Sequence, residues 1–126
     1  MAIIISTDDA PAAIGPYSQA VKTGNLLFVS GQLPLDSGSG DIIGNDIESQ
    51  TRQVLDNLHA IVRAADASLS GIVKCTCFLS DMNAFALFNQ TYAEYFGDTA
   101  PARECVEVAR LPKDVMVEIS AICELE

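Results

Sequence analysis

Positively charged residues are scarce in this chain. Seven Lys and Arg residues stand against 17 Asp and Glu residues, which gives a formal net charge of −10. The seven cations are scattered at positions 22, 52, 63, 74, 103, 110 and 113. Because a protein that reads nucleic acid draws most of its affinity from a basic patch on the phosphates, this distribution argues against an RNA or DNA ligand. A small anionic substrate fits these charges only if an individual cation holds it.

Long hydrophobic runs and targeting segments are also lacking. The longest apolar stretches, such as AIIIS and LLFV, are far shorter than the roughly 20 residues that cross a bilayer. The N-terminus shows neither a basic region nor a cleavage signal, so we expect a cytoplasmic protein with no membrane partner. Hydrophobic residues make up 49% and charged residues 19%, and we expect residues 1–126 to fold as a single domain.

Residues for the common metal and nucleophile sites are few. His59 is the only histidine, so we expect neither a Ser–His or Cys–His relay nor a structural zinc site. The cysteines form no CxxC pair and are expected to be free thiols; they are Cys75, Cys77, Cys105 and Cys123. The GxGxxG, GxxxxGK and HExxH motifs are absent, which leaves dinucleotide, P-loop and zinc-protease functions without support.

The hydrophobic pattern predicts two helices among several strands. An apolar stripe at helical spacing follows Asp46, a suitable N-cap, and an aromatic stripe follows Asp81 or Asn83 and stops at Gly97. The strands are expected at residues 3–5, 17–22, 26–30, 72–79, 102–109 and 115–123. This order predicts an α+β fold in which both helices pack on one face of a mixed sheet.

The second face of that sheet would remain uncovered. Its outward-pointing Val, Cys and Ala residues are too apolar for open water, so we expect it to be buried against other copies of the chain. The sequence therefore predicts a homo-oligomer.

Two charged residues lie in the last two predicted strands, where most neighbours are apolar. Alternation places Arg103 on one face with Cys105, and it places Glu118 on a face with Met116 and Ile122. Arg103 and Glu118 could form a structural ion pair, which is the commoner arrangement. Alternatively, they serve a site, since the planar guanidinium of an arginine suits the carboxylate of a small organic acid.

Two stretches near the N-terminus could line a pocket. In IGPYSQA a Gly-Pro turn fixes the direction of Tyr17, which either packs against a strand or presents its phenol to a ligand. In VSGQ the strand ends at Gly31, where the missing side chain would let a ligand approach the backbone.

Five blocks spread over the chain together resemble one family. They are AIGPYSQAV, GNLLFVSGQLPLD, QTRQVLDNL, FNQTYAEYF and PARECVEVARLPKDVMVEISAI, and they are similar to the RidA/YjgF family of small enamine/imine deaminases, also labelled endoribonuclease L-PSP. The resemblance implies a chorismate-mutase-like α+β fold and a homotrimer with three clefts between subunits. It also implies hydrolysis of 2-enamino or 2-imino acids, such as 2-aminoacrylate, to 2-oxo acids and ammonia without metal or organic cofactor.

The resemblance also implies roles for individual residues. Arg103 matches the arginine that grips the substrate carboxylate, and Glu118 matches the glutamate that orients the attacking water. Cys105 would contact the substrate through its backbone N–H. The other pocket positions that it implies are Tyr17, Ser30, Gly31 and Asn89. For the reaction itself, we expect a proton relay through water or Tyr17 to help expel ammonia.

Two functions from other classes are alternatives to the deaminase function that the resemblance implies. One is a non-catalytic trimer that binds 2-oxo acids or acts like a chaperone, and the other is an endoribonuclease or translation inhibitor, against which the charge of −10 argues.

Glu104 departs from the family, which usually has a small hydroxyl residue between Arg103 and Cys105. Alternation turns Glu104 away from the pocket, so we expect an effect on packing or surface charge. The pairing of the last two strands is open, because the short link between them suggests a hairpin whereas the family fold places another strand between them.

Overall fold

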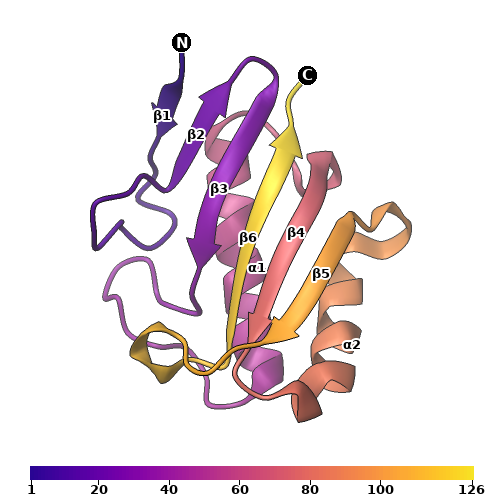
Figure 1. Cartoon of the computed structure of the whole chain (residues 1–126). Coiled ribbons are helices and arrows are strands. Elements are labelled where there is room, and N and C mark those ends of the chain that lie inside the picture. The colour runs from indigo at the N-terminus through magenta and orange to yellow at the C-terminus, as the bar shows by residue number, and fades with distance from the viewer.

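A six-stranded mixed sheet spans the width of the molecule (Figure 1). The computed structural model describes residues 1–126, and its strands follow the spatial order β1-β2-β3-β6-β4-β5. The pairs are antiparallel except for β4 and β5, which run parallel. The strands are β1 (Ile3–Ile5), β2 (Ala20–Thr23), β3 (Leu26–Gln32), β4 (Ile72–Leu79), β5 (Ala102–Glu107) and β6 (Val117–Glu124).

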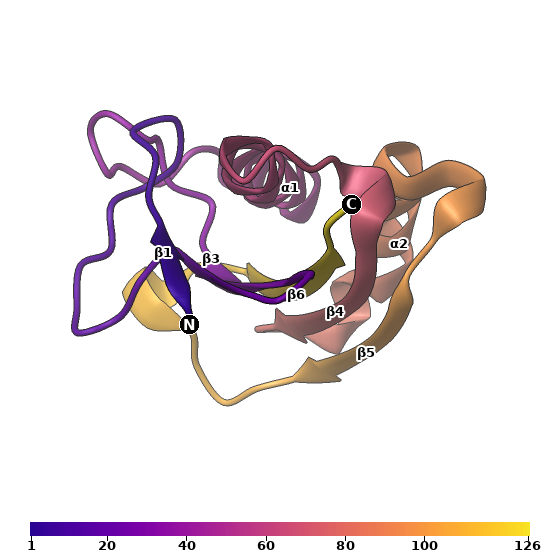
Figure 2. The ribbon, with the colours of Figure 1, turned by 90° about the horizontal axis from the view of Figure 1, so that it is seen from above.

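Two helices pack on one face of this sheet, behind it in the view of Figure 1 and on one side of it in Figure 2. They are α1 (Ile47–Ala64) and α2 (Phe85–Phe96), and the predicted α+β arrangement is confirmed. The side chain of Asp46 caps α1 by accepting a hydrogen bond from the Ser49 N–H at 2.8 Å. Neither helix is long and apolar enough to span a bilayer.

The second helix is entered through a short 3₁₀ turn. Asp81 caps this turn, Met82–Ala84, by accepting from the Asn83 N–H at 2.9 Å, so the earlier of the two expected caps is used. The α-helix ends at Phe96, and its C-cap is Gly97, whose φ of 54° lies in the region that favours glycine. Both ends therefore agree with the sequence signals.

The core lies between the helices and the covered face of the sheet. The fully buried face of α1 includes Val54, Leu55 and Leu58, which pack in one cluster with Leu27 of β3 and Ile119 of β6. Burying each such side chain contributes about 1.5–3 kcal/mol, which makes this interface the main source of stability.

The β2–β3 hairpin is shorter at its start than predicted. The expected strand over 17–22 begins only at Ala20, because residues before it follow a loop in which the Tyr17 N–H bonds the Gly15 carbonyl at 2.8 Å. At the other end, the pairing of β3 with β6 shifts register between Val29 and Gln32. This irregularity lies at Ser30 and Gly31, and bulges of this kind re-aim side chains.

The last two strands do not pair with each other. β4 lies between β5 and β6, parallel to β5 and antiparallel to β6, so the structure has the intervening strand and not the hairpin. The connection through α2 explains this arrangement. α2 returns the chain from the C-terminal end of β4 to the level of the N-terminal end of β4, so β5 then runs parallel to β4.

No helix covers the second face of the sheet (Figure 2). Phe28 and Val106 are 42% and 45% exposed on this open face, and Phe78 and Ile122 are half-buried there. An uncovered apolar surface is thus present, but its composition differs from the prediction. Cys75, Cys77, Cys123 and Ala121 point to the core instead, because strand alternation turns them toward the helices.

Candidate functional site

A pocket of about 370 Å³ opens where β3, β6 and the loop before β2 come together. Four of the predicted site residues line it: Tyr17, Ser30, Gly31 and Glu118. Its other walls are apolar or conformationally stiff and come from Ile14, Leu33 and Pro112. These three residues were not predicted, because Ile14 and Leu33 lie in loops and Pro112 begins a short 3₁₀ turn, and none of them follows a regular pattern.

Glu118 reaches this pocket because of strand alternation. Its neighbours Val117 and Ile119 point to the core and are fully buried, so Glu118 points to the open face. The side chain is half-buried and makes no ion pair or hydrogen bond with any group of the chain. Burial therefore raises the pKa of the Glu118 carboxyl above its ordinary value of 4.5.

Gly31 makes room for that carboxylate. A Cβ atom at this position would collide with Oε2 of Glu118 and would lie 2.9 Å from its Cδ atom. The sequence predicts a close approach to the backbone at Gly31, and the group that approaches is the side chain of Glu118.

Tyr17 and Ser30 are the polar neighbours of Glu118 in the pocket. The Tyr17 side chain is 48% exposed, and its hydroxyl accepts a long hydrogen bond of 3.4 Å from the Ile14 N–H. The Ser30 hydroxyl donates to the Ser18 carbonyl at 2.6 Å, so its proton is engaged while its oxygen can still accept.

The other predicted residues lie elsewhere, on and next to the edge strand β5. Arg103 is half-buried, and its Cζ atom lies 4.8 Å from the ring centroid of Tyr92 in α2. Cys105 follows on the same face, and burial raises the pKa of its thiol although the nearby Arg103 charge opposes this. A thiol of raised pKa is a poor nucleophile, which agrees with a role for its backbone alone.

Asn89 belongs to the Arg103 side of the molecule. It lies on α2 between Phe85 and Tyr92, two residues whose rings face the guanidinium. Its Oδ1 atom is buried and has no hydrogen-bond partner. A buried amide oxygen without a partner is costly, so this atom marks a place where a further group can bind.

A single chain does not bring Arg103 and Glu118 together. β4 lies between their strands. Glu118 of β6 pairs with Phe78 of β4, and Phe78 pairs in turn with Val106 of β5, which is three residues beyond Arg103. The two side chains also point to opposite faces, since Arg103 aligns with buried Cys75. The structural ion pair within one chain, the commoner alternative from the sequence, is therefore wrong.

Glu104 points away from the Arg103 side, as alternation predicts. Its carboxylate pairs with Lys74 at 3.1 Å and accepts a hydrogen bond from the Thr76 hydroxyl at 3.4 Å. It therefore changes the charge pattern of the open face and leaves Arg103 free.

Potential ligands for a metal are dispersed. No three His, Cys, Asp or Glu side chains are grouped so that they could hold a metal ion. All four cysteines are free, as expected, and Cys75, Cys77 and Cys123 are buried.

Comparison with known proteins identifies relatives over the whole length of the chain. A RutC family protein of Pyrococcus horikoshii is 56% identical, and the match covers 98% of both chains. The 2-iminobutanoate/2-iminopropanoate deaminase of Escherichia coli strain K12 is 51% identical over 97% of each chain.

Solved structures agree with this result. The crystal structure of the YjgF gene product of E. coli superposes with a TM-score of 0.93 at 48% identity, covering 98% of this chain and 99% of the other. E. coli TdcF with bound serine gives a TM-score of 0.94 at 46% identity, with the same coverage. The family profile described as Endoribonuclease L-PSP matches residues 7–125. The chain therefore belongs to the Endoribonuclease L-PSP family, which is also called the RidA/YjgF family.

Proposed function

We propose that the protein is a 2-enamine/2-imine deaminase, which hydrolyses 2-aminoacrylate-type intermediates to 2-oxo acids and ammonia. The observation that carries this proposal is the pocket of Glu118, where a half-buried, unpaired carboxylate lies against Gly31 and beside Tyr17. The E. coli relative named 2-iminobutanoate/2-iminopropanoate deaminase supports the same reaction class.

The proposal requires a second copy of the chain. Arg103 and Glu118 lie on different strands and opposite faces, so one chain offers either the carboxylate or the guanidinium to a small substrate. We propose a homotrimer in which the open sheet faces pack together and each cleft combines Arg103 of one subunit with Glu118 of its neighbour. The exposed Phe28 and Val106 on the open face support such burial.

Arg103 would anchor the substrate. A guanidinium binds a carboxylate through two parallel hydrogen bonds, which fixes both the position and the orientation of a 2-imino acid. The backbone N–H of Cys105 and the amide of Asn89 are further groups for this anchoring. Fixing the imine carbon next to a water molecule removes most of the entropic cost of the reaction.

Glu118 would activate the water. Its raised pKa makes it a stronger base than an exposed glutamate, so it can accept a proton as the water oxygen bonds to the imine carbon. Attack on the protonated imine gives an adduct with a hydroxyl and an amino group on one carbon. The proton that Glu118 holds then passes to the amino nitrogen, through water or Tyr17. Glu118 takes up the hydroxyl proton as the C–N bond breaks, so that ammonia leaves and the 2-oxo acid forms. Because an imine carbon is already electrophilic, these steps call for no metal or organic cofactor.

The test is an assay in which a lyase generates 2-aminoacrylate in situ and the formation of pyruvate is followed. Arg103→Ala should abolish the acceleration, whereas Glu118→Ala should lower the rate and leave the binding of a 2-oxo acid detectable. Arg110→Ala is the matched control, because Arg110 pairs only with Asp114 on the surface and lies outside the pocket. Full activity of the Arg103 variant would refute the proposal.

The family description also names an endoribonuclease. Cleavage of RNA is the weaker alternative for this chain, because its net charge is −10 and Arg52, Lys74 and Arg110 are already engaged in ion pairs. Salt-dependent binding of RNA, measured on protein free of contaminating nuclease, would favour that alternative.

A further inference from the structure

Three aromatic rings of α2 surround the guanidinium of Arg103. Its Cζ atom lies 4.8 Å from the ring centroid of Tyr92, 5.6 Å from that of Phe88 and 5.7 Å from that of Phe85. All three distances are within the range in which a cation is attracted by the face of an aromatic ring. The sequence showed these rings only as the apolar stripe of a helix.

The Tyr92 ring is the closest of the three and is firmly held. Only 6% of Tyr92 is exposed, and its ring lies between those of Phe88 and Phe96, with centroid distances of 5.6 and 4.7 Å. A ring fixed on both sides offers the guanidinium a rigid surface. Because Phe88 is fully buried and Phe85 is 37% exposed, the three rings extend from the core to the solvent.

No carboxylate pairs with Arg103, although acidic residues outnumber basic ones by 17 to 7. The acid next to it in sequence, Glu104, is held by Lys74 on the other face of the sheet. No acidic residue of the same chain therefore neutralises the charge of Arg103, and its guanidinium packs against aromatic rings instead.

This difference matters for a residue that must bind an anion. A carboxylate partner would occupy the N–H groups of the guanidinium and would compete with an incoming substrate, whereas a ring contacts only the flat face and leaves the edge free. We propose that Tyr92, together with Phe88 and Phe85, is a positioning residue that holds the Arg103 guanidinium through its π face and keeps its N–H groups available for the substrate carboxylate. This inference rests on the proposed function, in which Arg103 is the anchor.

The test compares a variant that keeps the ring with one that removes it. Tyr92→Phe retains the ring and should bind pyruvate, measured by titration calorimetry, with the dissociation constant of the wild type. Tyr92→Leu loses the ring, and its dissociation constant should rise roughly tenfold, as expected for a partly desolvated cation–π contact. In the deaminase assay the same variant should show a raised KM and a kcat within about twofold of the wild type.

Two further variants separate positioning from a general loss of packing. Leu58→Ala removes a fully buried side chain of α1 that is not part of the ring stack, so it should leave pyruvate binding unchanged while destabilising the fold. Phe85→Leu removes a more exposed ring at little cost to folding and should weaken binding, and it carries the test if Tyr92→Leu does not fold.

A double-mutant cycle tests whether Tyr92 acts through Arg103. In the Arg103→Ala background, Tyr92→Leu should have no further effect on pyruvate binding. Equal weakening by Tyr92→Phe and Tyr92→Leu would assign the effect to the hydroxyl and overturn the inference. So would wild-type binding by Tyr92→Leu while Arg103→Ala binds no pyruvate. If Arg103→Ala binds pyruvate like the wild type, the anchor itself, and with it the proposed function, is wrong.

Discussion

Among single residues, Glu118 has the environment that most directly predicts a measurable pH dependence. Burial raises the pKa of its carboxyl above 4.5, so the base form appears only as the pH rises through this higher value. If the base form activates water, kcat/KM should fall on the acidic side at a pH clearly above 4.5. The measurement is a pH–rate profile of pyruvate formation from 2-aminoacrylate.

Glu118→Gln provides the control for this profile. It keeps the shape of the side chain but cannot titrate, so the residual rate should lose the acidic limb. An unchanged acidic limb in this variant would assign the titration to another group, such as the substrate.

Gly31 offers a second test at the same scale. In Gly31→Ala the new methyl group would collide with Oε2 of Glu118, and the carboxylate would have to move. Because misplacement by about 1 Å can cost up to roughly 100-fold in rate, we expect kcat to fall by one to two orders of magnitude. Gly38→Ala, in an exposed loop away from the pocket, should retain full activity. Wild-type kcat in Gly31→Ala would show that the carboxylate position is unimportant.

The sequence predicts the directions of charged side chains well, because alternation in strands is a local property. It places Glu118 opposite Val117 and Ile119 and turns Glu104 away from Arg103, and the structure confirms both. It does not reveal what surrounds Arg103, because an aromatic stripe that packs into a core and one that also faces a cation have the same spacing.

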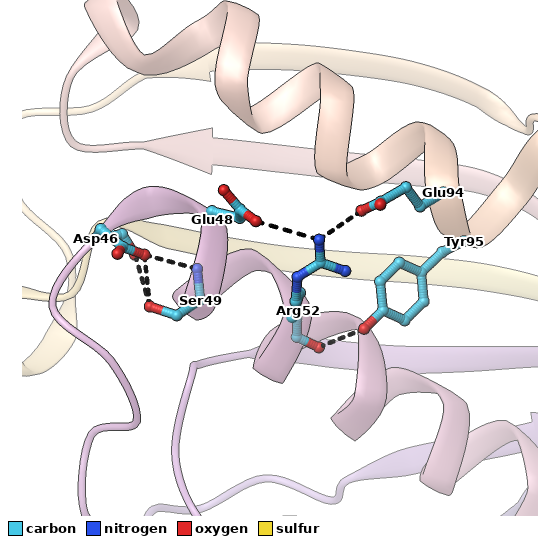
Figure 3. Close-up of polar contacts among 6 residues, drawn as sticks. All are labelled: Asp46, Glu48, Ser49, Arg52, Glu94 and Tyr95. Atoms are coloured by element: carbon cyan, nitrogen blue, oxygen red, sulfur yellow. Dashed lines mark hydrogen bonds and ion pairs between the residues drawn. The ribbon is translucent and has the colours of Figure 1, made fainter.

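At the scale of elements, polar contacts join the two helices on their outer sides (Figure 3). Arg52 of α1 reaches both Glu48 and, at 2.8 Å, Glu94 of α2. The Tyr95 hydroxyl shares its one proton between Oδ1 of Asp56, at 2.9 Å, and the more distant Arg52 carbonyl, at 3.3 Å. None of these residues lines the pocket, and their contacts help to hold α2, which carries the rings around Arg103.

Tyr95→Phe tests this helix contact. The substitution removes the hydroxyl that bonds Asp56 and Arg52, and the free energy of unfolding should decrease by about 1 kcal/mol. Chemical denaturation gives this value, and kcat/KM should stay within about twofold because no site residue changes. A large loss of activity in a stable Tyr95→Phe protein would show that α2 must be held more exactly than we infer.

Element types could be predicted from the sequence, whereas the neighbours of the last strands could not. The cap at Asp46 and the stop at Gly97 are local signals and mark the helix ends correctly. The position of β4 between β5 and β6 depends on pairing between distant segments, which strand patterns do not encode.

For the molecule as a whole, the candidate site consists of two halves that one chain holds apart. The pocket of Glu118 opens at β3 and β6, whereas Arg103 lies at the edge strand β5 on the opposite face. The members of both halves could be predicted from the sequence, but their separation could not. Alternation tells which face of its own strand a side chain occupies, but it does not tell how far apart two strands lie in the sheet. A division of this kind is expected when a site forms between identical subunits.

Mixed assemblies test this division directly. Arg103→Ala should be inactive alone and Glu118→Ala should retain only a low rate. In the proposed trimer, an assembly of both variants would form clefts with Arg103 from one subunit and Glu118 from its neighbour. With random assembly from equal amounts, roughly one cleft in four would be intact, so co-expressed variants should regain about a quarter of the wild-type activity. Mixing the purified proteins without subunit exchange is the control and should give only the low rate of the Glu118→Ala protein. If the co-expressed trimers are no more active than this control, both groups must come from the same subunit. The fold of one chain, which places them on opposite faces, would then have to rearrange.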